Sequence, residues 1–267
     1  RSNFFCIRGT DLDRLTPEDF LTIDGWLNTG RLVVTRKTPL PHQAEAIQAI
    51  VAGLGDQDRA TAVMACGTGK TLVALWVAEQ MNCRRIVVLV PSLALIRQTL
   101  HEWLKETKWK APRFICVCSD PTVSSGSDEL VVRQSDVDFP VTTDSLEVRK
   151  FLSDSSGDAQ VIFTTYQSSK VVGEAAKDLP PFNLGIFDEA HKTAGREGSN
   201  FGFALSDKNL YIDKRLFLTA TPRHYDISRT DKEGGAREVF SMDAPAVYGP
   251  CVYTLPFAEA ARRGIIC

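Results

Sequence analysis

The sequence has no excess of charge of either sign and no long apolar run. Its 31 Lys and Arg residues are balanced by 33 Asp and Glu residues, which leaves a net charge of −2. This balance provides no overall basic field of the kind that draws a protein to nucleic acid, although a local basic groove fits within a neutral total. No stretch is apolar for long enough to cross a bilayer, and no signal peptide is recognisable. We therefore expect a cytoplasmic protein with no membrane partner.

Paired cysteines and clustered histidines are also missing. The seven cysteines are an odd number, none of them forms a C-x-x-C pair, and the four histidines are scattered. This argues against the common zinc-binding spacings and favours a reducing compartment. Cys116 and Cys118 lie two positions apart in an apolar run, so a strand would place both on one buried face.

The sequence does contain a glycine-rich string, MACGTGKT at 64–71, between an apolar run and a helix-forming run. A glycine turn that leads into a helix presents backbone N–H groups to a polyphosphate, and the helix dipole favours the negative charge. Lys70 can reach the β- and γ-phosphates, and the Thr71 hydroxyl can bind Mg²⁺. The strict pattern has Gly where this chain has Met64, but Gly67 and Gly69 remain for the turn. The predicted nucleotide-binding segment comprises Cys66, Gly67, Thr68, Gly69, Lys70, Thr71 and Leu72.

Apolar runs alternate with amphipathic stretches along most of the chain. The apolar runs predict strands at 61–65, 85–90, 114–117, 161–165, 184–187, 216–219 and 252–255. The amphipathic stretches predict helices at 17–27, 41–55, 69–81, 93–106, 146–152, 167–177 and 257–263. Strands that are apolar throughout are typical of a parallel sheet with helices on both faces. We therefore expect an α/β protein with three layers and a mostly parallel central sheet.

Asp188 and Glu189 directly follow the apolar run at 184–187. An ATPase needs a second Mg²⁺ ligand and a group that activates water, usually at the end of a neighbouring buried strand. Asp188 is the candidate Mg²⁺ ligand, and Glu189 is the candidate that orients or deprotonates the attacking water. Adjacent acids in a turn are common at surfaces, so the assignment depends on their combination with Lys70 and Thr71.

The order of these motifs resembles the first RecA-like domain of superfamily 2 helicases and translocases, over about 39–223. MACGTGKT is similar to motif I, VLVPSLALIRQT at 88–99 to motif Ia, DEAH at 188–191 to motif II and LTATPR at 218–223 to motif III. TTYQS at 164–168 resembles a further motif at a strand end. The wording is most similar to restriction-associated DNA translocases, which include type I and type III restriction subunits and the single-chain type ISP enzymes. The resemblance implies a RecA-like P-loop NTPase fold that uses ATP and Mg²⁺ to drive movement on DNA, within a restriction-modification or mobile-element protein.

The resemblance also implies roles for individual residues near the nucleotide. Gln43 would read the adenine through its side-chain amide, although Pro39-Leu40-Pro41 stands where the family often has an arginine. His191 would act with the acids of motif II and link them to motif III or to a second lobe. Thr219 and Thr221 would couple the nucleotide state to the grip on nucleic acid. Without the family, Gln43 would be interpreted as a surface residue of a helix.

Contacts with the nucleic-acid backbone are implied just past two strand ends, at Ser92, Arg97, Thr165 and Gln167. Such contacts fix position without reading sequence, which suits a motor that moves along any DNA. Without the family, each would be interpreted as a helix cap or a solvated side chain. Trp76, Trp103 and Trp109 are interpreted as core residues rather than platforms for stacked bases.

We expect three parts: a helical lead-in at 1–38, the motor domain at 39–243 with an insertion or long loop at 119–144, and at 244–267 the start of a link to a second RecA-like domain. The chain begins with Arg1 and ends just after a helical pattern, so we expect a piece of a longer protein. That protein would carry the second domain, with nuclease and methyltransferase domains as further candidates, and its expected partner is DNA, most of all duplex DNA. The isolated piece would bind ATP weakly and turn it over near background, because an arginine finger contributes about a thousandfold or more. Two alternatives remain open, an RNA-directed helicase and a nucleotide-dependent interaction module without motor activity.

Overall fold

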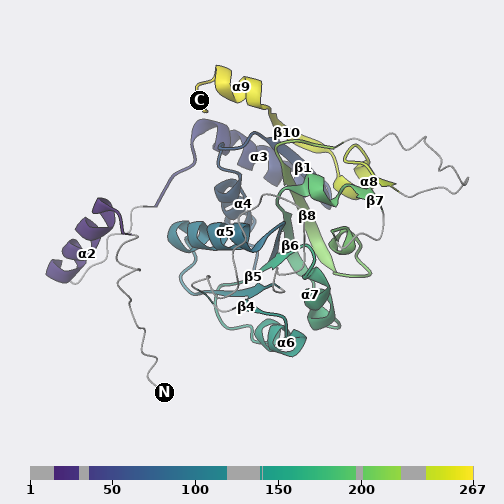
Figure 1. Ribbon diagram of the computed structural model, residues 1–267, viewed down its shortest axis with the longest axis horizontal. Coiled ribbons are helices and arrows are strands. Elements are labelled where there is room, and N and C mark those ends of the chain that lie inside the picture. The colour runs from purple at the N-terminus through teal and green to yellow at the C-terminus, as the bar shows by residue number, and fades with distance from the viewer. Residues whose placement is uncertain are drawn as a thin grey trace, which may run out of the picture. The chain divides into compact units, whose positions relative to one another are not determined.

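A computed structural model describes residues 15–29, 36–118, 139, 141–196, 201–223 and 239–266 (Figure 1). The chain divides into two compact units, Arg1–Thr38 and Pro39–Cys267. In the first unit, helix α2 (Pro17–Thr29) begins where the sequence predicts it. Thr16 N donates to Asp19 Oδ2 over 2.9 Å, and Asp19 N donates to Thr16 Oγ1 over 3.2 Å. This reciprocal pair satisfies amides that the first helical turn leaves free.

The second unit is built on one sheet of eight strands, and every neighbouring pair of strands is parallel. In spatial order the strands are β10 (Cys251–Leu255), β1 (Arg59–Met64), β8 (Ile212–Thr219), β6 (Phe182–Phe187), β2 (Arg85–Val90), β5 (Ala159–Thr165), β3 (Pro112–Val117) and β4 (Val141–Thr142). All seven residues of β5 are buried, as expected for a strand that is covered on both faces. The predicted α/β class with a parallel central sheet is confirmed.

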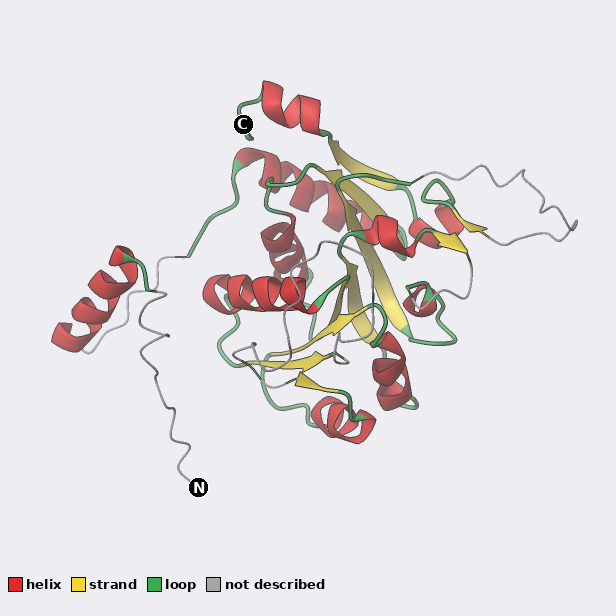
Figure 2. Ribbon diagram, viewed as in Figure 1, coloured by secondary structure: helices red, strands yellow, loops and turns green. Residues whose placement is uncertain are grey.

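Helices cover both faces of the sheet (Figure 2). One face carries α3 (Pro41–Asp56), α4 (Lys70–Gln80) and α5 (Leu93–Glu106), and the other carries α6 (Ser145–Ser153), α7 (Ser169–Ala176) and the short α8 (Pro245–Tyr248). Along β2, Val88 belongs to the first apolar cluster and Leu89 to the second, because successive strand residues point to opposite faces. Trp76 and Trp103 are buried in the first cluster, as predicted, together with Cys116 and Cys118.

The largest differences from the predicted strands are at β8 and β4. β8 begins at Ile212, whereas the sequence predicted a start at 216. The prediction was too short because charged residues in the first half of the strand interrupt the apolar pattern. Arg215 is nevertheless buried, with its Nη1 2.7 Å from Asp207 Oδ1 and three bonds to backbone carbonyl groups. β4 occupies part of the region 119–144 that we expected to be an insertion or loop, and residues 119–138 and 140 of that region lie outside the described residues.

The C-terminal segment adds an edge strand beside the glycine-rich loop. β10 pairs with β1, and Ala65 N donates to Leu255 O over 2.9 Å. Helix α9 (Phe257–Arg262) follows β10. A two-stranded antiparallel sheet joins β7 (Gly195–Arg196) to β9 (Val239–Phe240), and short 3-10 helices η2 and η3 span Ala190–Thr193 and Phe203–Leu205. Residues 224–238 lie outside the described residues. The boundaries proposed at 38 and 243 stay predictions. No helix in the described ranges is both long and apolar enough to span a bilayer.

Candidate nucleotide-binding site

The glycine-rich loop connects the end of β1 to the start of α4. Met64 is the last residue of β1 and is wholly buried, so it belongs to the strand rather than to the turn. The left-handed conformations fall at Gly67 and Gly69, with φ of 82° and 84°. The departure from the strict pattern at position 64 is therefore compatible with the loop, because glycine is needed at 67 and 69.

The loop fits a polyphosphate in its shape and in its unused donors. A Cβ at Gly69 would overlap the side-chain amide of Gln43, so a side chain at this position would displace that amide. Within the described part of the chain, the amides of Gly69, Lys70 and Thr71 donate to no protein acceptor, and the first turn of α4 has no acidic residue. Free amides at a helix start, next to a lysine, form an anion-binding arrangement.

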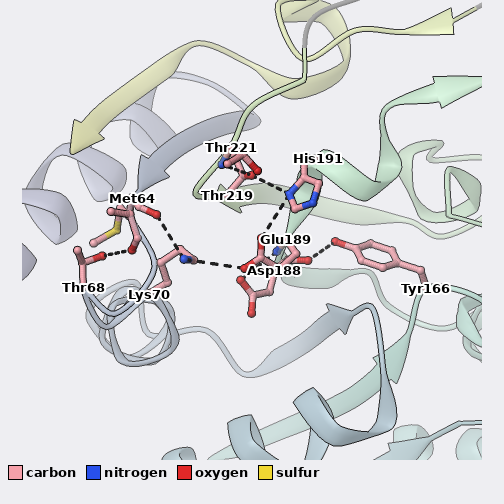
Figure 3. Close-up of polar contacts among 10 residues, drawn as sticks. Met64, Thr68, Lys70, Tyr166, Asp188, Glu189, His191, Thr219 and Thr221 are labelled. Atoms are coloured by element: carbon pink, nitrogen blue, oxygen red, sulfur yellow. Dashed lines mark hydrogen bonds and ion pairs between the residues drawn. The ribbon is translucent and has the colours of Figure 1, made fainter. Parts of the chain in front are cut away.

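Polar contacts connect this loop to the loops that follow β6 and β8 (Figure 3). Lys70 Nζ donates to Met64 O over 3.3 Å and lies 4.0 Å from Glu189 Oε1. Glu189 Oε2 lies 3.3 Å from His191 Nδ1, which is 3.1 Å from Thr219 Oγ1. Burial lowers the pKa of His191 more than Glu189 raises it, so the imidazole is neutral at neutral pH and the contact with Glu189 is no full ion pair. β8 lies between β1 and β6, which places Thr219 between the two loops.

Asp188 has the electrostatics of a cation ligand. Burial is the main cause that raises its pKa to about 6; Glu189 acts in the same direction, and Lys70 opposes both. A carboxylate in this environment gains from a bound cation, because the cation offsets both burial and the neighbouring acid. No group of three potential metal ligands was found among the residues the structure describes. Mg²⁺ often takes only one or two protein ligands beside waters and phosphate oxygens, so Asp188 and the Thr71 hydroxyl are a donor set of the right chemistry.

Gln43 is buried on α3 and faces the glycine-rich loop. Its Nε2 donates to Thr68 O over 3.1 Å, and its Oε1 accepts from Leu40 N over 2.9 Å. The alternative that it is a surface residue is wrong, since it is 6 % exposed. The amide keeps one donor and one acceptor site, the number that a bidentate pair with adenine requires. His42, which is not among the predicted site residues, also contacts the loop, because its Nε2 lies 3.1 Å from Thr68 O. In the sequence, only its position next to Gln43 could have indicated that His42 lies at this loop.

The family follows from a comparison of the whole domain. The sequence model of the family described as type III restriction enzyme, res subunit, matches residues 36–224. The chain belongs to that family. This confirms the resemblance to restriction-associated helicases and translocases.

Relatives of this res-subunit domain are named as helicases or restriction enzymes. A probable helicase of African swine fever virus is 31% identical over 216 residues, which are 80% of this chain and 22% of the relative. An ATP-dependent type ISP restriction-modification enzyme, LlaBIII bound to DNA, has a TM-score of 0.73 at 29% identity over 95% of this chain and 17% of its own. A nuclease-deletion mutant of the type ISP enzyme LlaGI, in complex with a DNA substrate mimic, has a TM-score of 0.67 at 32% identity over 86% and 21%. The chain thus covers about a fifth of the length of each of these proteins.

The predicted nucleic-acid contacts lie at or after the carboxyl ends of β2 and β5. Ser92 caps α5 by accepting from Leu95 N over 3.4 Å, and Arg97 is partly buried one turn later. Thr165 is buried, and its hydroxyl donates to Ser168 Oγ over 3.1 Å, whereas Gln167 is exposed. The structure thus presents Gln167 to solvent and keeps the Thr165 side chain inside. Of the predicted nucleotide-binding residues, Cys66 is exposed and Leu72 is buried. Thr219 and Thr221 contact each other, because Thr221 N donates to Thr219 Oγ1 over 3.2 Å.

Proposed function

We propose that this domain binds ATP with Mg²⁺ and that, within a longer protein, it hydrolyses ATP to drive movement along duplex DNA. The observation that carries the proposal is the approach of Lys70 Nζ to Glu189 Oε1, at 4.0 Å. A phosphate-binding lysine and an acid that activates water must both act at one γ-phosphate, and the short distance between these two side chains supports such roles.

Each site residue then has a definite task. Lys70 and the free amides of the loop hold the phosphates, and Thr71 and Asp188 hold Mg²⁺. When bound, Mg²⁺ would neutralise charge on the phosphate oxygens. Glu189 orients the water or accepts its proton. Through His191 and Thr219, the loop after β6 is joined to the loop after β8, so nucleotide state and nucleic-acid grip can influence each other.

Movement along DNA is supported by the relatives rather than by the net charge of this chain. The two solved type ISP enzymes are described with DNA or a DNA mimic bound. Both are several times longer than this domain, which supports a second RecA-like domain, and nuclease and methyltransferase domains, as partners in one chain. A restriction-modification or mobile-element protein is therefore the proposed setting, in the cytoplasm.

The test is ATP hydrolysis by the full-length protein with duplex DNA, single-stranded DNA or RNA. We expect Mg²⁺-dependent hydrolysis that duplex DNA stimulates most, and its loss in Lys70→Ala. Lys214→Ala is the control, since Lys214 is partly exposed and pairs with Asp58 away from the site. Greater stimulation by RNA would identify an RNA-directed helicase, and hydrolysis that no nucleic acid stimulates would identify an interaction module. The isolated chain is expected to hydrolyse ATP near background.

A further inference from the structure

Tyr166 connects the TTYQS segment to the Asp188-Glu189 turn. It follows β5 directly, is wholly buried, and its hydroxyl donates to Asp188 O over 2.7 Å (Figure 3). β2 lies between β5 and β6 in the sheet, so the tyrosine side chain bridges the end of the intervening strand. That strand holds both loops, because Tyr166 N donates to Val90 O and Asp188 N donates to Leu89 O, over 3.1 and 2.9 Å.

The bond to Asp188 O fixes the peptide that precedes Glu189. The carbonyl of this peptide accepts from Tyr166, and its N–H donates to Asp188 Oδ1 over 3.0 Å, so both ends are held. The orientation of this peptide determines φ of Glu189, which is 49°, in the left-handed region that non-glycine residues rarely adopt. In this conformation the Glu189 carboxylate lies between Lys70 and His191, at 4.0 and 3.3 Å. A residue held in such a conformation needs surrounding contacts that maintain it.

The hydroxyl group is not explained by packing of the ring. The ring contacts Phe187 and Phe201, with centroid distances of 6.3 and 5.5 Å, and phenylalanine would serve equally well for both. A buried hydroxyl needs a hydrogen-bond partner, and here the partner is the carbonyl next to Glu189. The contact therefore acts on the conformation of the turn.

The Tyr166 end of this connection belongs to a compact turn. Ser168 N donates to Thr165 O over 3.1 Å, and the hydroxyl of Thr165 donates to Ser168 Oγ over the same distance. Gln167, between them, is exposed. A contact made on Gln167 therefore falls on a turn whose other side is the buried tyrosine.

We propose that Tyr166 is a positioning residue, which holds Glu189 in its left-handed conformation and relays contacts made at Gln167 to that carboxylate. This inference rests on the proposed function, since it concerns the acid that activates water. It also gives a physical route by which a bound strand at the end of β5 reaches the hydrolytic turn at the end of β6.

The test is Tyr166→Phe in the full-length protein, with ATP hydrolysis measured against ATP and against duplex DNA. We expect maximal DNA-stimulated kcat to fall about tenfold to a hundredfold, as for other displacements of a reacting group. KM for ATP and the DNA concentration at half-maximal stimulation should stay within about twofold, since neither binding surface changes. Tyr248→Phe is the matched control, because Tyr248 is equally buried in the same apolar cluster and its hydroxyl lies 3.0 Å from Thr193 Oγ1.

A second pair of variants separates the donor from the volume. 4-Aminophenylalanine at position 166 keeps a hydrogen-bond donor, so kcat should return to within about threefold of wild type. 4-Methylphenylalanine fills the same space without a donor, so the variant that carries it should keep the low kcat of Tyr166→Phe. Unchanged kcat in Tyr166→Phe, an equal fall in Tyr248→Phe, or equal rates for the two para-substituted residues would each overturn the inference. A wild-type protein without ATP hydrolysis would instead refute the proposed function.

Discussion

Lys70 Nζ and Glu189 Oε1 lie 4.0 Å apart, although they follow β1 and β6, which β8 separates in the sheet. The parallel arrangement makes this approach possible, because the carboxyl ends of all three strands meet at one edge. His191 and Thr219 extend the same set of contacts to the end of β8. The glycine-rich loop, the Asp188-Glu189 turn and the end of β8 are thus neighbours through direct side-chain contacts.

Glu189 and Lys70 should affect different steps. Glu189→Gln keeps the size of the side chain but removes its basicity, so kcat should fall at least about a hundredfold while ATP affinity stays within about threefold. Lys70→Ala should instead abolish measurable ATP affinity. Steady-state hydrolysis and calorimetric titration with ATP measure the two effects in the full-length protein. Loss of affinity in Glu189→Gln with unchanged kcat would contradict these roles.

The bond between His191 and Thr219 should matter for stimulation rather than for ATP binding. Thr219→Val and His191→Ala should each reduce the ratio of DNA-stimulated to basal hydrolysis. The double variant should be no worse than the more affected single variant, because both remove one contact. Thr107→Val is a control for loss of a buried threonine hydroxyl, since Thr107 bonds to Glu79 on the α4–α5 side of the domain. Independent, additive losses would show that the two residues act separately.

The raised pKa of Asp188 predicts a pH-dependent stability. Its pKa is about 6 in the folded chain and near 4 when unfolded, so the folded state binds the proton more tightly. Stability from this group is therefore greatest below pH 4 and is lost as pH rises through 6. Asp188→Asn should raise the free energy of unfolding by roughly 1–3 kcal/mol at pH 8 without nucleotide, and by little at pH 4.5.

Urea unfolding of the purified chain at pH 4.5, 6 and 8 measures this difference. Asp154→Asn is the control, because hydrogen bonds from Ser156 lower the pKa of Asp154 and removal of that carboxylate should give no gain at pH 8. An Asp188→Asn variant that is less stable than wild type at pH 8 would show that the buried charge is already compensated.

Gln43 should determine the choice of base. Its remaining donor and acceptor match adenine, so Gln43→Ala should reduce the preference for ATP over GTP by about 1–3 kcal/mol, the range of one bidentate pair. Gln48→Ala is the matched control, since Gln48 is exposed on the same helix. Competition titrations with ATP and GTP on the full-length protein give the ratio. Equal weakening for both nucleotides would restrict Gln43 to its contact with Thr68.

Much of the fold could be predicted from apolar continuity, and its failures have local causes. β2 and α5 have the predicted bounds, because both lie between clear turn signals and have unmixed patterns. β8 was predicted too short because Asp213, Lys214 and Arg215 resemble a surface segment. Only tertiary contacts with Asp207 and nearby carbonyl groups make a buried arginine acceptable there.

The site could be predicted as motifs but not as contacts. Lys70 and Glu189 were identifiable because their chemistry is tied to fixed positions after strands. Tyr166 was not, because its role depends on the carbonyl of Asp188, a backbone group that no sequence pattern marks. The burial of Gln43 was likewise invisible, since it results from the close approach of the loop at Gly69.

Mg²⁺-dependent ATP affinity of the full-length protein, in Thr71→Val, Asp188→Asn and the double variant, tests the proposed site most directly. If hydroxyl and carboxylate bind one cation, each single substitution removes most of the gain in affinity that Mg²⁺ gives, and the double substitution removes hardly more. The two losses should therefore be non-additive by about 0.5–3 kcal/mol. Additive losses, or a gain from Mg²⁺ that survives in the double variant, would mean that the two residues do not share a metal ion.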